Sequence, residues 1–201
     1  MEKNSNTGVL IACCGLNFCM IAGNKRGKSE ESEYIHKIND DVLYAWSGLS
    51  LNEDALEPIK GYANDRLTLL RATELTEDYV YNHLATMMVA PRSYILAGRD
   101  EDGLFYIITV GVNKEERRVE RKVLCPTDNK HIATLIVLPK SFDDPDTLKY
   151  YNKEVVQSAT ESETLPDLFL ECVKIVRSVA DSDEEINGDG ICLSWITSRF
   201  V

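Results

Sequence analysis

The sequence is poor in positive charge and contains no long hydrophobic run. It has 22 lysines and arginines against 33 aspartates and glutamates, which gives a formal net charge of −11 over 201 residues. An acidic surface repels phosphate groups, so we expect no binding to nucleic acid or to an anionic membrane. No apolar stretch approaches the roughly 20 residues of a membrane-spanning helix. The first residues also lack the basic and apolar regions of a secretory signal, so we expect no secretion.

Histidine is scarce, and the six cysteines are not spaced like metal ligands. The three histidines are scattered, and no serine, histidine and acid can be grouped by spacing into a catalytic triad. Cys13, Cys14 and Cys19 lack a second CxxC or CxxH partner, which makes a zinc site improbable. All cysteines but Cys125 lie in apolar runs, as free core thiols do in a reducing compartment. On these residues we expect no metal site.

The apolar patterns predict that the chain begins with β-strands. The runs 8–14 and 17–23 are separated only by Gly15 and Leu16, which is typical of a β-hairpin. Periodicity does not decide whether the apolar run 132–138 is a strand or a helix. The mixed-sign segment 114–122 is expected to be a solvated loop or strand. Further strands are expected at 34–38, 42–46, 94–97, 104–110 and 191–196.

Helical patterns lie in separate blocks between these strands. A helix is predicted from Ser50, because Glu53 completes a capping box. A second is predicted after Thr76 and ends at Pro91, and a third begins near Pro166. The first would bury one face made of Leu56, Ile59, Ala63, Leu67 and Leu70. Hairpin-linked strands with helices grouped apart predict an α+β fold, and the absence of repeats or linkers predicts a single domain over 1–201.

Two short motifs suggest ligand binding. The segment 22–29 resembles a phosphate-binding loop that would use Gly27, Lys28 and Ser29, but three glutamates follow it closely and no apolar helix face does. We favour a basic turn after a strand and keep nucleotide binding as an alternative. The segment Asp100-Glu101-Asp102 could attract a cation, although an exposed acidic hairpin tip explains it more simply.

Thr7 stands just before the first predicted strand, behind a short extension of residues 1–6. A threonine freed by cleavage can act as a nucleophile with its own α-amine as base. Taken alone, Thr7 is more simply explained as a residue at the edge of a strand.

The order of several segments resembles the β subunits of the proteasome, which have the N-terminal-nucleophile hydrolase fold. The resemblance rests on Thr7-Gly-Val-Leu-Ile-Ala, Met20-Ile-Ala-Gly-Asn-Lys-Arg, His36-Lys-Ile with Tyr44-Ala-Trp-Ser-Gly, Tyr94-Ile-Leu-Ala-Gly-Arg-Asp, Pro166-Asp-Leu-Phe and Ile186-Asn-Gly-Asp-Gly-Ile. The last two segments are most similar to the third, non-catalytic β-subunit type. The resemblance implies a four-layer α-β-β-α sandwich of two antiparallel sheets. Residues 113–165 carry little of it.

The same resemblance implies that the chain is not an enzyme. Active members expose their threonine by cutting after glycine, and here Asn6 precedes Thr7. The family's aspartate after the second strand corresponds to Asn24, which cannot hold an ammonium as a carboxylate does. Its tuning lysine corresponds to Lys37 and is retained.

Two later positions of the family also differ. Its late aspartate and serine correspond to Glu184 and Asn187. No glycine occurs between Gly111 and Gly188, although active members need a Ser-Gly-Gly turn beside the nucleophile. Groups that act as a unit fail together, so we interpret Thr7, Asn24, Lys37, Glu184 and Asn187 as vestigial positions.

The resemblance therefore predicts a structural subunit of the 20S core particle in cytoplasm and nucleus, in contact with other α and β subunits. It implies no cofactor. The alternatives are an active threonine peptidase that uses Thr7 and a small nucleotide-binding protein that uses Gly27, Lys28 and Ser29.

Overall fold

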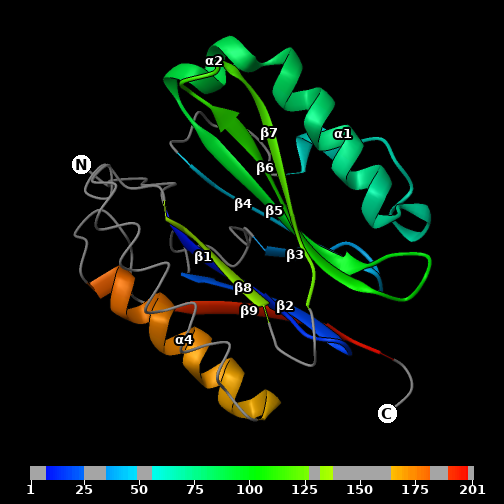
Figure 1. The fold of residues 1–201 in the computed structure, drawn as a ribbon, viewed down its shortest axis with the longest axis vertical. Helices are drawn as coiled ribbons and strands as arrows, with labels where there is room; N and C mark the ends of the chain where they lie inside the picture. The colour runs from blue at the N-terminus through cyan, green and yellow to red at the C-terminus, as the bar shows by residue number, and fades with distance from the viewer. Residues whose placement is uncertain are drawn as a thin grey trace.

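The computed structural model describes residues 8–24, 35–48, 56–126, 132–137, 164–181 and 190–198. Within these residues the chain has an α+β fold with two antiparallel sheets that face each other (Figure 1). One sheet has four strands and the other has five. The α+β class predicted from the sequence is therefore confirmed.

The four-stranded sheet has the order β8-β1-β2-β9. The predicted opening hairpin is confirmed as β1 (Val9–Cys14) and β2 (Phe18–Asn24), both fully buried. The undecided apolar run is a strand, β8 (Ile132–Val137), which pairs with β1 along its whole length. The last predicted strand is confirmed as β9 (Ile191–Thr197), which pairs with β2.

The five-stranded sheet has the order β3-β4-β5-β6-β7. Its strands β3 (Ile35–Lys37), β4 (Val42–Gly48), β5 (Arg92–Arg99) and β6 (Phe105–Asn113) lie where the sequence predicts them, with β5 and β6 longer than expected. The charged segment forms an edge strand, β7 (Arg118–Leu124). Its charged residues, Arg118, Glu120, Arg121 and Lys122, discourage pairing of this edge with another chain.

The helix predicted from Ser50 is wrong over the described residues. The chain forms two 3-10 turns, η1 (Glu57–Ile59) and η2 (Asn64–Arg66), and the α-helix α1 (Leu69–Asn82) begins only after them. Thr68 caps α1 by accepting a hydrogen bond from the Arg71 N–H at 3.1 Å. Gly61, whose φ is +91°, interrupts the expected helix in a conformation that other residues rarely adopt.

The helix predicted after Thr76 is also displaced. Thr76 is an interior residue of α1, and a short second helix, α2 (Leu84–Val89), follows His83. Met87 is buried as expected, and Pro91 follows the end of α2. The last helix is confirmed as α4 (Leu165–Asp181), with its apolar stripe buried.

In the part of the chain that the structure describes, the buried side chains form three groups. Because side chains alternate along a strand, each sheet presents one face to the other sheet and one face to a helix. α4 covers the outer face of the four-stranded sheet, and α1 covers the outer face of the five-stranded sheet (Figure 1). The third group lies between the sheets and contains Leu10, Ala12, Cys14, Cys19, Ile21, Ile35, Leu43, Ala45, Ile95, Ala97, Phe105, Ile107 and Ile196.

Candidate functional site

Asn24 is one of the predicted site residues that the structure describes. It is buried at the end of β2. Only 4% of it is exposed, and its Oδ1 accepts a hydrogen bond from the backbone N–H of Val9 at 2.8 Å. The neutral amide therefore fixes the start of β1.

The start of β1 is also fixed from the other sheet. The Ser47 hydroxyl on β4 donates a 2.5 Å hydrogen bond to the Gly8 carbonyl, and both residues are buried. Gly48 follows at the end of β4, where an added Cβ would lie 2.4 Å from the Pro91 carbonyl oxygen. Backbone therefore packs against backbone here, and only glycine fits.

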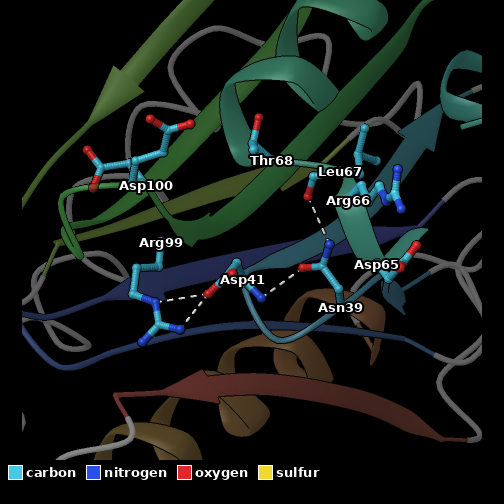
Figure 2. A pocket seen from close by; sticks show the side chains of 9 residues that line it. Asn39, Asp41, Asp65, Arg66, Leu67, Thr68, Arg99 and Asp100 are labelled. Carbon is cyan, nitrogen blue, oxygen red and sulfur yellow. Dashed lines mark hydrogen bonds and ion pairs between the residues drawn. The ribbon is translucent and has the colours of Figure 1, made fainter. Parts of the chain in front are cut away.

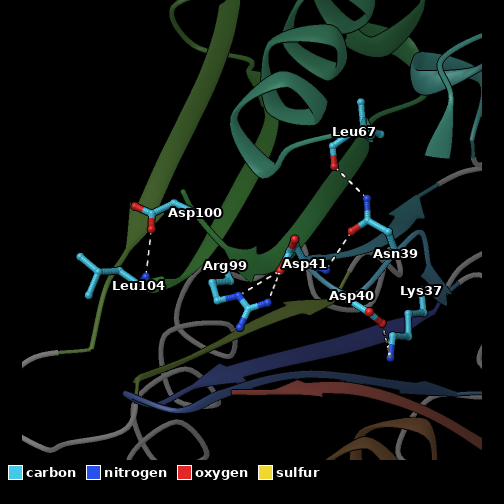
Figure 3. A network of polar contacts seen from close by, with 8 residues as sticks. All are labelled: Lys37, Asn39, Asp40, Asp41, Leu67, Arg99, Asp100 and Leu104. Carbon is cyan, nitrogen blue, oxygen red and sulfur yellow. Dashed lines mark hydrogen bonds and ion pairs between the residues drawn. The ribbon is translucent and has the colours of Figure 1, made fainter. Parts of the chain in front are cut away.

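Lys37 lies far from this end of the sandwich. It pairs with Leu43 on β4, four residues from Ser47, which corresponds to about 13 Å along an extended strand. Its Nζ is 3.8 Å from Asp40 Oδ1, and about half of its side chain is exposed (Figure 3). Its charge also lowers the pKa of Cys19, at the opposite end of β2 from Asn24. The structure therefore does not bring Lys37 together with Asn24.

The other predicted site residues lie outside the described residues. They are Thr7, Glu184, Asn187 and the Gly27-Lys28-Ser29 motif. The acidic tip is described, and there Asp100 Oδ1 accepts a hydrogen bond from the Leu104 N–H at 2.9 Å within its own turn. In the parts of the chain that the structure describes, no group of three or more histidines, cysteines, aspartates or glutamates could hold a metal ion.

Sequence reasoning missed a polar cavity of about 130 Å³ (Figure 2). It lies where the β3–β4 turn meets the start of α1 and the β5–β6 turn. The residues that line it are Asn39, Asp41, Asp65, Arg66, Leu67, Thr68, Arg99, Asp100 and Glu101. The acidic segment Asp100-Glu101-Asp102 reaches this place, since Asp100 and Glu101 line the cavity.

The polar groups of this cavity bind one another. Arg99 donates to Asp41 Oδ1 from Nε at 2.9 Å and from Nη2 at 2.5 Å. Asn39 accepts from the Asp41 N–H at 2.8 Å and donates to the Leu67 carbonyl at 2.8 Å (Figure 3). The cavity is also smaller than the roughly 300–1,000 Å³ of typical ligand sites. These contacts tie the β3–β4 turn to Arg99 at the end of β5 and to the segment before α1.

The buried thiols are not activated nucleophiles. Burial raises the pKa of Cys172 and of Cys19 to about 12, and it raises the pKa values of Cys13 and Cys14 further. A thiol reacts as its thiolate, so these groups are held in their unreactive form at neutral pH.

The comparisons with known proteins add no identification. No protein-family model matches the chain, and no curated protein matches its sequence. Among the described residues, no helix is long and apolar enough to cross a membrane.

Proposed function

We propose that the chain is a non-catalytic structural β subunit of the 20S proteasome core particle. In this role it forms part of a ring that encloses the proteolytic chamber in ubiquitin-dependent protein degradation. Its partners are other α and β subunits, its locations are cytoplasm and nucleus, and it needs no cofactor. The resemblance of the sequence segments supports this role, and so do the arrangement of the sheets and helices and the residues around Gly8.

The first supporting feature is the arrangement of sheets and helices. Two antiparallel sheets face each other, α1 covers one outer face and α4 covers the other (Figure 1). This is the order expected for the four-layer α-β-β-α sandwich of N-terminal-nucleophile hydrolases. A fold alone does not imply a function, and the residues of the site decide which chemistry is possible.

The observation that carries the non-catalytic part is the fixed start of β1. A threonine nucleophile needs nearby groups that hold its α-amine and accept its proton. Here the neighbouring acid is replaced by Asn24, whose amide oxygen accepts from the Val9 backbone. Lys37, the last residue of β3, pairs instead with Asp40 in the β3–β4 turn. The residues that surround Gly8 thus support folding of the hairpin.

Native mass spectrometry of the chain purified from its own cells tests this proposal. We expect a particle of hundreds of kilodaltons that releases a subunit of 22.7 kDa, with residues 1–6 still attached. A lone chain of 22.7 kDa would contradict ring membership and would reopen the nucleotide-binding alternative.

A matched pair of variants separates assembly from catalysis. A tagged chain with Thr7→Ala should assemble and leave the peptidase activities of the particle unchanged, as should the same chain with Thr7→Ser. A released subunit that begins at Thr7, or a peptidase activity lost only in the alanine variant, would show that the chain is an active peptidase subunit.

A further inference from the structure

The β1–β2 hairpin places two cysteines directly opposite each other. Cys14, the last residue of β1, pairs with Cys19 on β2. The Gly15 N–H donates to the Phe18 carbonyl at 3.0 Å, so Leu16 and Asn17 form a two-residue connection. Both cysteines are free thiols and are fully buried.

The hydrogen-bond pattern fixes the type of pair. Opposed residues in antiparallel strands alternate between pairs that exchange backbone hydrogen bonds and pairs that do not. Gly15 directs its N–H toward β2, and so does Val9, whose N–H reaches Asn24. Cys14 lies between such residues in the alternation, so Cys14 and Cys19 form a non-hydrogen-bonded pair. Such pairs have Cα atoms about 4.5 Å apart, inside the range of roughly 4.4–6.8 Å that disulfides span.

The surroundings favour Cys19 as the first of the two to react. The N–H of Ile196 and the positive charges of Arg99 and Lys37 lower the pKa of Cys19, partly offsetting the effect of burial. Burial raises the pKa of Cys14, and the neighbouring Cys19 raises it further. Cys14 and Cys19 are cross-strand partners whose side chains lie in the same buried group between the sheets.

We propose that Cys14 and Cys19 are an oxidation site, at which hydrogen peroxide forms a disulfide across the end of the β1–β2 hairpin. The Cys19 thiolate attacks one peroxide oxygen, the O–O bond breaks, and a sulfenic acid and hydroxide are formed. The Cys14 thiolate then attacks the Cys19 sulfur and displaces hydroxide. Both hydroxides take up the protons released by the two thiols. Two thiols and one peroxide thus give one disulfide and two waters.

The position of the pair decides which oxidant can act. The thiols lie one residue from the turn, where Leu16 and Asn17 are exposed. Opening of the hairpin end admits a small neutral molecule such as peroxide more readily than a bulky charged disulfide such as oxidised glutathione. Because burial disfavours both thiolates, the reaction is slow and follows the opening of the hairpin.

A neighbouring cysteine on the same strand provides the matched control. Cys13 points to the opposite face of the sheet, where it packs in the same group of buried side chains as Cys172 beneath α4. It pairs with Met20 on β2 and has no thiol opposite it. Oxidation controlled by the cross-strand geometry therefore leaves Cys13 reduced.

The test is peroxide treatment of the folded full-length chain, followed by differential alkylation and fragmentation mass spectrometry. Free thiols are blocked with N-ethylmaleimide, and reduced disulfides are then labelled with iodoacetamide. Residues 4–25 form one tryptic peptide that contains Cys13, Cys14 and Cys19. We expect iodoacetamide on Cys14 and Cys19 and N-ethylmaleimide on Cys13. Before reduction, the peptide should be lighter by two hydrogens.

The variants give the decisive comparison. Cys14→Ser should abolish the disulfide and leave Cys19 to proceed to the sulfinic acid, whereas Cys13→Ser should leave the disulfide yield unchanged. A Cys13–Cys172 or Cys14–Cys125 disulfide in the wild-type chain would overturn the proposal. Thiols that stay reduced in the folded chain, while the same peroxide oxidises the chain in urea, would overturn it as well. The wild-type mapping decides the matter even where a variant folds poorly.

Discussion

The hydrogen bond between Tyr44 and Thr76 leads to an asymmetric prediction. Thr76 lies inside α1, and its hydroxyl donates to the Ala72 carbonyl at 2.7 Å. The Tyr44 hydroxyl on β4 is 2.8 Å from the same Thr76 oxygen. A threonine hydroxyl has one proton, so Tyr44 must be the donor in this contact. The bond ties the helix to the five-stranded sheet.

The two single substitutions therefore have different costs. Tyr44→Phe removes a donor and leaves the Thr76 proton satisfied, so we expect a loss of about 1 kcal/mol in the free energy of unfolding. Thr76→Val leaves the buried Tyr44 hydroxyl without an acceptor, so we expect a loss of about 2 kcal/mol in the free energy of unfolding. The double variant replaces both partners by apolar groups of similar shape. It should be no less stable than Thr76→Val alone, although additivity would place it near 3 kcal/mol.

Urea unfolding of the purified chain measures these values. Trp46 is buried in the same group of side chains as Tyr44 and reports the transition by its fluorescence. The slope of the transition should be equal in all four proteins, so that the midpoints compare stabilities. Additive losses in the double variant, or a greater loss from Tyr44→Phe than from Thr76→Val, would refute the assignment of Tyr44 as donor.

Three further predictions concern stability. Ser47→Ala leaves the buried Gly8 carbonyl without its hydroxyl donor, and thermal unfolding should show a loss of about 1–2 kcal/mol. Gly98→Ala places a methyl group 2.1 Å from the Asp41 carbonyl oxygen, so the β3–β4 turn must move; we expect a loss above about 3 kcal/mol in urea unfolding, against little change for an exposed alanine control, Ala85→Ser. The four strongly buried thiols have pKa values above their ordinary 9.0, so the folded chain keeps protons that the unfolded chain releases. Stability should be full below about pH 9 and then fall by ~1.4 kcal/mol per pH unit for each thiol, and a constant urea midpoint up to about pH 10 would contradict this.

The strands show how much local pattern can predict. The opening hairpin follows from two apolar runs with a short connection, and α4 follows from apolar residues at helical spacing. Both elements bury a face that the sequence already marks. Their boundaries shift by a residue or two, since the last residues of an element depend on its neighbours.

The helix predicted from Ser50 shows where pattern fails. Leu56, Ile59 and Leu67 have helical spacing, yet they lie in or beside 3-10 turns. Ile59 and Leu67 are buried because the connection packs against α1 and the five-stranded sheet, whereas Leu70 is 61% exposed. Apolar residues at helical spacing indicate which side chains are buried, but not that the backbone is helical. A loop that packs across one face of the core can have the same spacing.

The candidate site was only partly visible in the sequence. Asn24 could be named because it ends a recognisable strand, but its bond to Val9 depends on the register of the hairpin. Ser47 was named only within a resembling segment, since its partner Gly8 is 39 residues away on the other sheet. Asp41 and Arg99 meet across 58 residues, and nothing local to either marks the pairing.

The sequence by itself determined the α+β class, the opening hairpin and the last helix. Each of these features depends on residues close together in the sequence, whose propensities and hydrophobic periodicity can be read directly. The tertiary structure alone decided that 132–137 is a strand, because that run forms its hydrogen bonds with β1. It also decided that Cys14 faces Cys19 while Cys13 faces the helix. These outcomes depend on strand register and on contacts between distant segments, which a local pattern does not encode.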